Sequence, residues 1–150
     1  MTMQEDRDAL LRTAATLRAQ GRIPDALALL ARLEAAHPTF SRLFQERGHC
    51  HVLLRNTPAA IYALNEAVRR NPTLPASWDM LEQLHRLADN AEQAEAAARS
   101  LATLRRLPVA IVVANSLFAD GDLAQAEQVL REYLGQDREN VGALRLLARI

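Results

Sequence analysis

Apolar residues recur at every third or fourth position, in runs of about a dozen residues separated by short polar breaks. This spacing gathers apolar side chains on one face of an α-helix, and the other face stays polar. The breaks read AQGRIP, LRNTP, LADN and ADGD. Because two helices joined by such a short break pack antiparallel, the pattern predicts an all-α protein made of helix pairs.

The helix pairs repeat with a period of about 34 residues, which is typical of a solenoid. We place the repeats at residues 7–40, 41–74, 75–106 and 107–140, with a partial repeat at 141–150 and a single array over 1–150. The third repeat is shorter than the others, so its angle to the fourth is the least defined. One position holds the same small residue in each full repeat: Ala26, Ala60, Ala94 and Ala126.

Several breaks contain residues that favour helix ends. Thr57 followed by Pro58 predicts an N-cap with proline in the first turn. Asp122 with Gln125 three residues later predicts a capping box. Gly21 and Gly121 provide the backbone freedom that the ends of two first helices need.

The repeats resemble the tetratricopeptide repeat family. They share a large residue in the first helix (Phe44, Trp78), a small residue one turn later (Ala14, Gly48, Ala114), the alanines above, and a proline after the second helix (Pro38, Pro72). The resemblance covers Arg7 to Ile150 and implies an α-α superhelix with a concave face. It implies a fold more strongly than a function, since one fold serves many functions.

Residues 47–78 and 118–150 are also similar to the N-terminal repeats of bacterial proteins in which such an array precedes a sulfotransferase domain. This narrower resemblance implies a recognition or tethering module of a larger bacterial protein. The sulfuryl donor, 3′-phosphoadenosine-5′-phosphosulfate, would bind in the second domain. None of its site residues is in this chain, so we assign the chain no cofactor.

The charges are balanced, with 18 basic and 18 acidic residues, and every basic residue is Arg. Zero net charge removes the electrostatic reason for a nucleic-acid or anionic-membrane partner. The first residues are acidic and lack the features of a signal peptide. The longest apolar stretch, Leu107 to Ala119, is too short to span a bilayer. We therefore expect a cytoplasmic protein.

His49, Cys50 and His51 form the most reactive group of side chains, and a Cys/His pairing is one way to build a nucleophile or a metal site. On a helix, however, residues two apart point to different faces. We expect Cys50 and His51 to pack in the interior and predict no metal site. The chain also lacks the common phosphate-binding, metalloprotease and hydrolase motifs, so we predict no catalytic residue. A catalytic fragment built around His49 and Cys50 remains the weakest alternative.

The family resemblance places ligands on the concave face, which is lined by the first helix of each repeat. Arginines beside apolar residues there fit an acidic or polar peptide. Leu11, Ala15, Glu46, Ala76 and Met80 stand where a receptor for chaperone tails needs basic and amide side chains, so that class is disfavoured. The candidate groove residues are Arg18, Phe40, Arg42, Gln45, His49, Leu53, Asp79, Gln83, Arg86, Asn115 and Phe118.

The last residues, Val141 to Ile150, have the pattern of another first helix without a partner helix after it. A natural array usually ends with a polar capping helix. We therefore expect the chain to be an N-terminal piece of a longer protein. Two other functions remain open: a homo-oligomerisation module that uses this apolar end, and a free-standing adaptor.

Overall fold

The computed structural model describes residues 2–150, and these residues form helices without any strand. The prediction of an all-α protein built from helix pairs is confirmed. The helices are α1 (Met3–Ala19), α2 (Ile23–Ala36), α3 (Ser41–Leu53), α4 (Thr57–Arg70), α5 (Pro75–Leu87), α6 (Ala91–Arg105), α7 (Val109–Ala119), α8 (Leu123–Leu134) and α9 (Val141–Leu147).

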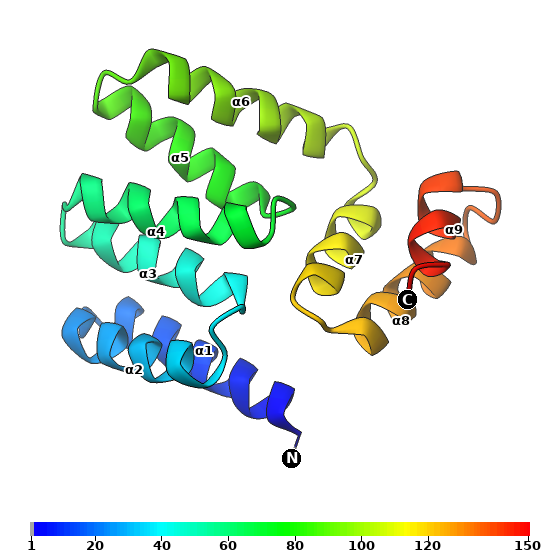
Figure 1. Ribbon diagram of the computed structural model, residues 1–150, viewed down its shortest axis with the longest axis horizontal. Coiled ribbons are helices and arrows are strands. Elements are labelled where there is room, and N and C mark those ends of the chain that lie inside the picture. The colour runs from blue at the N-terminus through cyan, green and yellow to red at the C-terminus, as the bar shows by residue number, and fades with distance from the viewer. Residues whose placement is uncertain (1) are drawn as a thin grey trace.

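The first three helix pairs stack on one another, with α2 against α3 and α4 against α5 (Figure 1). Small residues allow this close packing. The repeated alanines Ala26, Ala60, Ala94 and Ala126 are fully buried. Gly48 lies so close to Leu64 that a methyl group on Gly48 would be 2.6 Å from the Leu64 Cγ atom. Small side chains at these positions therefore set the distance between paired helices.

The fourth pair does not continue this stack. α6 and α7 meet at 114°, and only Arg106, Leu107 and Pro108 connect them. α7 packs on α8 and α9, and this group lies beside the edge of the stack (Figure 1). The regular superhelix implied by the family resemblance therefore extends over α1 to α6 and changes direction at α7, where the short third repeat ends. Within residues 2–150 no single helix has the length and apolar composition to span a bilayer; α6 and α7 meet those criteria only when taken together.

Two of the predicted helix caps differ in the structure. Asn56, and not Thr57, is the N-cap of α4, and its side-chain oxygen accepts a hydrogen bond from the Ala59 amide at 3.2 Å. Asp122 does begin α8, but its side chain makes no capping bond. It binds a distant arginine instead. Gly21 and Gly121 have φ of 77° and 81°, so they use the backbone freedom predicted for them, although Arg55 and Asp89 also have positive φ, at 55° and 58°.

Candidate functional site

A buried ion pair joins the first helix pair to the fourth. Arg7, on α1, donates from Nη2 to both carboxylate oxygens of Asp122 at 2.8 Å. Only 5% of the Arg7 side chain and 2% of the Asp122 side chain are exposed. Burial alone would lower the pKa of Arg7, but hydrogen bonds to Asp122 and Asp8 raise it above its usual value. This arginine therefore stays charged and requires its partner.

Asp120, in the turn between α7 and α8, binds the beginning of α3. Its carboxylate accepts hydrogen bonds from the Ser41 amide and the Ser41 hydroxyl, both at 2.9 Å. Because Phe40 provides no side-chain cap, Asp120 performs that role from another repeat. Burial raises the pKa of Asp120, and the bonds from Ser41 and the nearby Arg42 and Arg7 counteract part of that rise.

Asn71, at the end of α4, completes these contacts. It is fully buried, and its amide donates to the Ser41 hydroxyl at 3.1 Å and to the Ser116 hydroxyl at 2.9 Å. We refer to the polar contacts made by Ser116, Asp120 and Asp122 with the first two helix pairs as the junction. The junction fixes α7 beside α1 and α3, although residues 7 and 122 lie in the first and the fourth repeat.

The first helices of the stack share one face, and polar side chains connect them across it. Arg18 on α1 donates to Glu46 on α3. Gln45 on α3 accepts a hydrogen bond from Ser77 on α5 at 2.6 Å. These bonds hold the side chains of the concave face in fixed positions, which lowers the entropy that a ligand must overcome on binding.

The predicted groove residues of the stack differ in accessibility. Arg42 and His49 are half-buried, and Leu53 is exposed. Phe40 is only 2% exposed, and its ring centre is 4.0 Å from the Cζ atom of the Arg7 guanidinium that covers it. Phe40 therefore belongs to the core. The candidates on α5 are Asp79, Gln83 and Arg86. Asp79 accepts a hydrogen bond from Gln83 at 3.2 Å, and Arg86 donates one to Glu82 at 2.8 Å.

Asn115 and Phe118 do not share this face. Asn115 donates to the Ile111 carbonyl of its own helix at 2.9 Å. Phe118 packs in the core cluster of α7, α8 and α9, with the Arg149 guanidinium 4.8 Å from its ring centre. They were expected in the groove on the assumption that the fourth pair stacks like the others. The sharp turn after α6 places them elsewhere.

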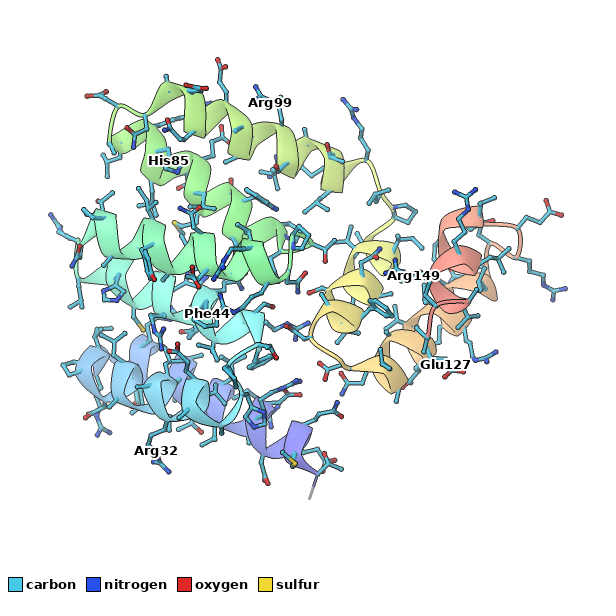
Figure 2. All side chains as sticks on the ribbon, in the orientation of Figure 1. Arg32, Phe44, His85, Arg99, Glu127 and Arg149 are labelled. Atoms are coloured by element: carbon cyan, nitrogen blue, oxygen red, sulfur yellow. The ribbon has the colours of Figure 1, made fainter. Side chains whose placement is uncertain are left out.

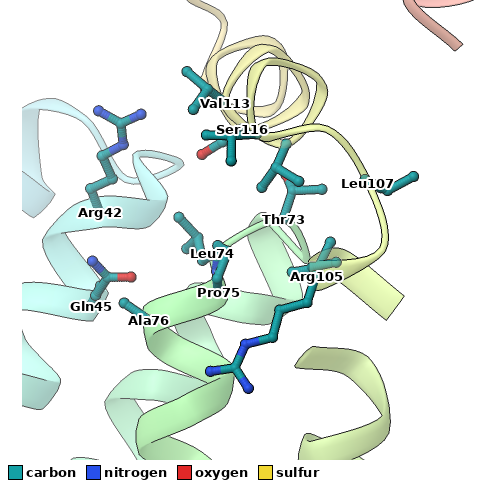
Figure 3. A pocket seen from close by; sticks show the side chains of 13 residues that line it. Arg42, Gln45, Thr73, Leu74, Pro75, Ala76, Arg105, Leu107, Val113 and Ser116 are labelled. Carbon is teal, nitrogen blue, oxygen red and sulfur yellow. The ribbon is translucent and has the colours of Figure 1, made fainter. Parts of the chain in front are cut away.

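A cavity of about 450 Å³ lies where the concave face meets α7 (Figure 3). One wall is formed by Arg42 and Gln45 of α3 together with the start of α5. The other wall is formed by α7 and the end of α6. Leu74, Leu104 and Val112 are among its apolar lining residues. Its size and apolar lining are those of a typical ligand pocket.

Of the residues that line this cavity, the candidates predicted from the sequence include only Arg42 and Gln45, and those missed include Arg105, Val112 and Val113. One signal for the valines is present in the sequence. The stretch from Val109 to Ala119 is apolar almost all round, whereas a helix with one buried face needs only a stripe. Val109 is 78% exposed and Val113 is 39% exposed, so the apolar side chains that this helix does not need for its buried face lie at the surface. The position of Arg105 depends on the turn after α6, which no local pattern predicts.

The His49, Cys50 and His51 cluster does not form a reactive centre. Cys50 is fully buried, and burial raises the pKa of its thiol to about 11. A thiol with that pKa is almost entirely protonated at neutral pH and is a poor nucleophile. The prediction that Cys50 packs in the interior is confirmed. Within residues 2–150 no three His, Cys, Asp or Glu side chains come together in a way that could hold a metal ion.

Three histidines, the buried His85 and the half-buried His49 and His51, predict a pH dependence of stability. Burial is the main cause that lowers the pKa of His49, His51 and His85. The unfolded chain therefore binds more protons than the folded one below about pH 6.5. We expect the urea midpoint to fall as the pH decreases from about 7.5 to 5.5. Replacing two of them in a His49→Gln, His85→Gln variant should make the midpoint less sensitive to pH. An equal dependence in the variant would contradict this account.

Comparison with known proteins supports the repeat assignment. Residues 8–39, which span the first helix pair, match the family model described as tetratricopeptide repeat. No curated protein and no solved structure matches the chain. The match covers α1 from Asp8 onward, α2 and the turn between them, and the later helix pairs have the same antiparallel arrangement (Figure 1).

Proposed function

We propose that the chain is a protein-binding scaffold that holds a peptide segment of its partner on the concave face of α1, α3 and α5. The repeat match to residues 8–39 supports a role in protein interaction. The observation that carries the proposal is the ordered concave face, in which Arg18 with Glu46 and Gln45 with Ser77 link three successive first helices. Glu46 and Ser77 are themselves buried, so the polar groups of these links that an extended ligand can reach are those of the partly exposed Arg18 and Gln45.

The two ends of this face are apolar, and its middle is polar. Leu53 and Leu87 are 55% and 75% exposed at the ends of α3 and α5. The cavity beside α7 lies at the opposite end of the same helices. Arg42 lines that cavity, Arg86 directly precedes Leu87, and the polar side chains of His49, Asp79 and Gln83 lie between the two ends. A peptide with both acidic and apolar residues matches this distribution, because polar contacts set its register and apolar contacts add affinity.

Selection from a displayed library of random linear peptides tests this function. We expect the intact protein to enrich peptides that share a motif, and a variant with Arg42→Glu and Arg86→Glu to bind their synthetic forms at least about tenfold more weakly. The matched control carries Arg32→Glu and Arg99→Glu, which make the same charge change on the exposed surfaces of α2 and α6 (Figure 2). Unchanged binding by the first variant, with its fold intact, would remove the concave face as the binding site.

In the cell, the same proposal makes the chain the recognition or tethering module of a larger bacterial protein in the cytoplasm. Its cofactor chemistry, if any, would lie in another domain. The link to a sulfotransferase is a prediction from sequence resemblance. Sulfuryl transfer to a protein substrate by the intact gene product should fall when residues 1–150 are deleted; equal activity would remove the link.

Homo-oligomerisation is a second candidate, and the exposed surface of α9 favours it. Val141 and Leu144 are 58% and 46% exposed. Apolar side chains that are exposed together on a short helix favour association with another apolar surface. We expect light scattering to show self-association at high concentration that Leu144→Glu reduces. A monomer at every concentration, unaffected by the substitution, would exclude this role for α9.

A further inference from the structure

We propose that the cavity between α3, α5 and α7 is the anchor site for an apolar side chain of an acidic peptide, and that filling it favours the docked position of α7. This inference rests on the proposed function, since it names the part of the concave face that binds most tightly. It differs from the general groove because one wall of the site belongs to the displaced fourth helix pair.

The walls of the cavity come from two parts that have little direct packing between them. α7 packs on α8 and α9, and the close helix contacts do not include α7 with α5 or α6. Val112 and Val113 of α7 line the cavity together with Leu74 and Leu104 of the stack. A space of about 450 Å³ remains there. Apolar walls around such a space gain contact and lose hydration when an apolar group enters.

The charge around the cavity selects an acidic neighbour for that apolar group. Arg42 and Arg105 lie on opposite sides of it in Figure 3, and none of the lining residues is acidic. Arg105 is exposed, and no ion pair or hydrogen bond occupies its guanidinium within residues 2–150. Arg42 forms an ion pair with Asp120 at 3.8 Å, too far for a hydrogen bond. Arg105 is therefore the guanidinium that is free for a carboxylate of the ligand, and Arg42, already paired with Asp120, can add a second N–H donor.

The position of the cavity links binding to the junction. Junction contacts are polar and lie next to the cavity: Ser116 both lines the cavity and accepts a hydrogen bond from Asn71. A ligand that touches α7 and α5 together binds only when α7 is docked. By mass action it then shifts the protein toward the docked form.

Peptides selected from the random library test the site. We expect them to combine Asp or Glu with a bulky apolar residue. Val113→Trp, which fills the cavity, and Arg105→Glu, which reverses the charge at its rim, should each weaken them at least about tenfold. Arg99→Glu on the same helix is the matched control and should leave their affinity unchanged. Because Arg105 is exposed and unbonded, its substitution tests the site even if Val113→Trp disturbs the fold.

Four results are distinguishable. Loss of affinity in both variants, with bound peptide slowing hydrogen exchange in α7, supports the proposal. Peptides that keep their affinity in both variants but lose it with Arg86→Glu overturn the anchor site and leave the general groove in place. Slow exchange confined to α1, α3 and α5 overturns the link to docking. If no peptide is enriched, the anchor site and the proposed function both fall.

Discussion

Replacing Asp122 with alanine is expected to destabilise the protein by about 3–5 kcal/mol. The substitution leaves the Arg7 guanidinium charged and buried, with only 5% of that side chain exposed. Asp8 still accepts hydrogen bonds from Arg7 at 2.9 and 3.1 Å, but it contacts one edge of the guanidinium. Since a domain of this kind has a free energy of unfolding of about 5–15 kcal/mol, the loss is a large share of the total.

Urea unfolding of Asp122→Ala beside the unaltered protein measures this effect. Asp25→Ala is the matched control, because Asp25 also pairs with an arginine but both side chains are more than half exposed. That control should change stability by less than about 1 kcal/mol. Equal effects of the two substitutions would mean that the Arg7 pair is as solvated as a surface pair.

Leu64→Ala is expected to cost about 2–5 kcal/mol. Leu64 is fully buried and packs with Leu81, Leu84 and Val68 in the core between the second and third helix pairs. Its removal leaves a space that the neighbouring helices fill only in part. Thermal or urea unfolding measures the loss, and Leu54→Ala, at an exposed position in the turn between α3 and α4, is the control. A loss below about 1 kcal/mol at Leu64 would contradict the close packing of α3 and α4.

The same contact predicts a change of sign at Gly48. On its own, Gly48→Ala puts a methyl group 2.6 Å from the Leu64 Cγ atom and should destabilise the protein by about 1–3 kcal/mol. In the Leu64→Ala background that overlap is gone. The better helix propensity of alanine should then stabilise the protein, by at most about 1 kcal/mol. If Gly48→Ala changed the stability in the same direction in both backgrounds, the two residues would not be in contact.

The fold of the stack follows from local patterns, which is why the sequence predicts it. Helical periodicity and the recurring alanines depend on neighbours within one or two repeats. Gly21 and Gly121 mark helix ends because a positive φ is a local requirement. Thr57 was assigned as the cap of α4 one residue too late, since Asn56 is an equally good cap and the choice depends on where the turn closes.

The position of the fourth pair depends on contacts between distant residues, and the sequence alone does not show them. Asp122 fits a capping box by its spacing, yet its carboxylate binds Arg7 in the first repeat. Asp120 and Asn71 are ordinary turn residues in the sequence, and the structure uses both to attach α7. These partners become neighbours only after the chain turns at Pro108.

In the candidate site, too, some residues follow from local repeat positions and others depend on contacts between distant parts of the chain. Arg42 and Gln45 were placed on the concave face from repeat positions, and the structure finds both at the cavity. Asn115 and Phe118 were selected by the same rule and lie elsewhere, because the rule assumes regular stacking. Arg105 and Val113 enter the site for that reason too. Which side chains form the cavity is thus decided by one change of direction in the array.

A double-mutant cycle on Arg7 and Asp122 tests the docked position of the fourth helix pair most directly. Stabilities are measured for Arg7→Ala, Asp122→Ala, both together and the unaltered protein. The buried contact at 2.8 Å predicts a coupling free energy of about 1.5–3 kcal/mol. In an array that continued its regular stacking, the two residues would be far apart and their effects would add. A coupling within about 0.5 kcal/mol of zero would contradict the docked arrangement and, with it, the cavity that depends on it.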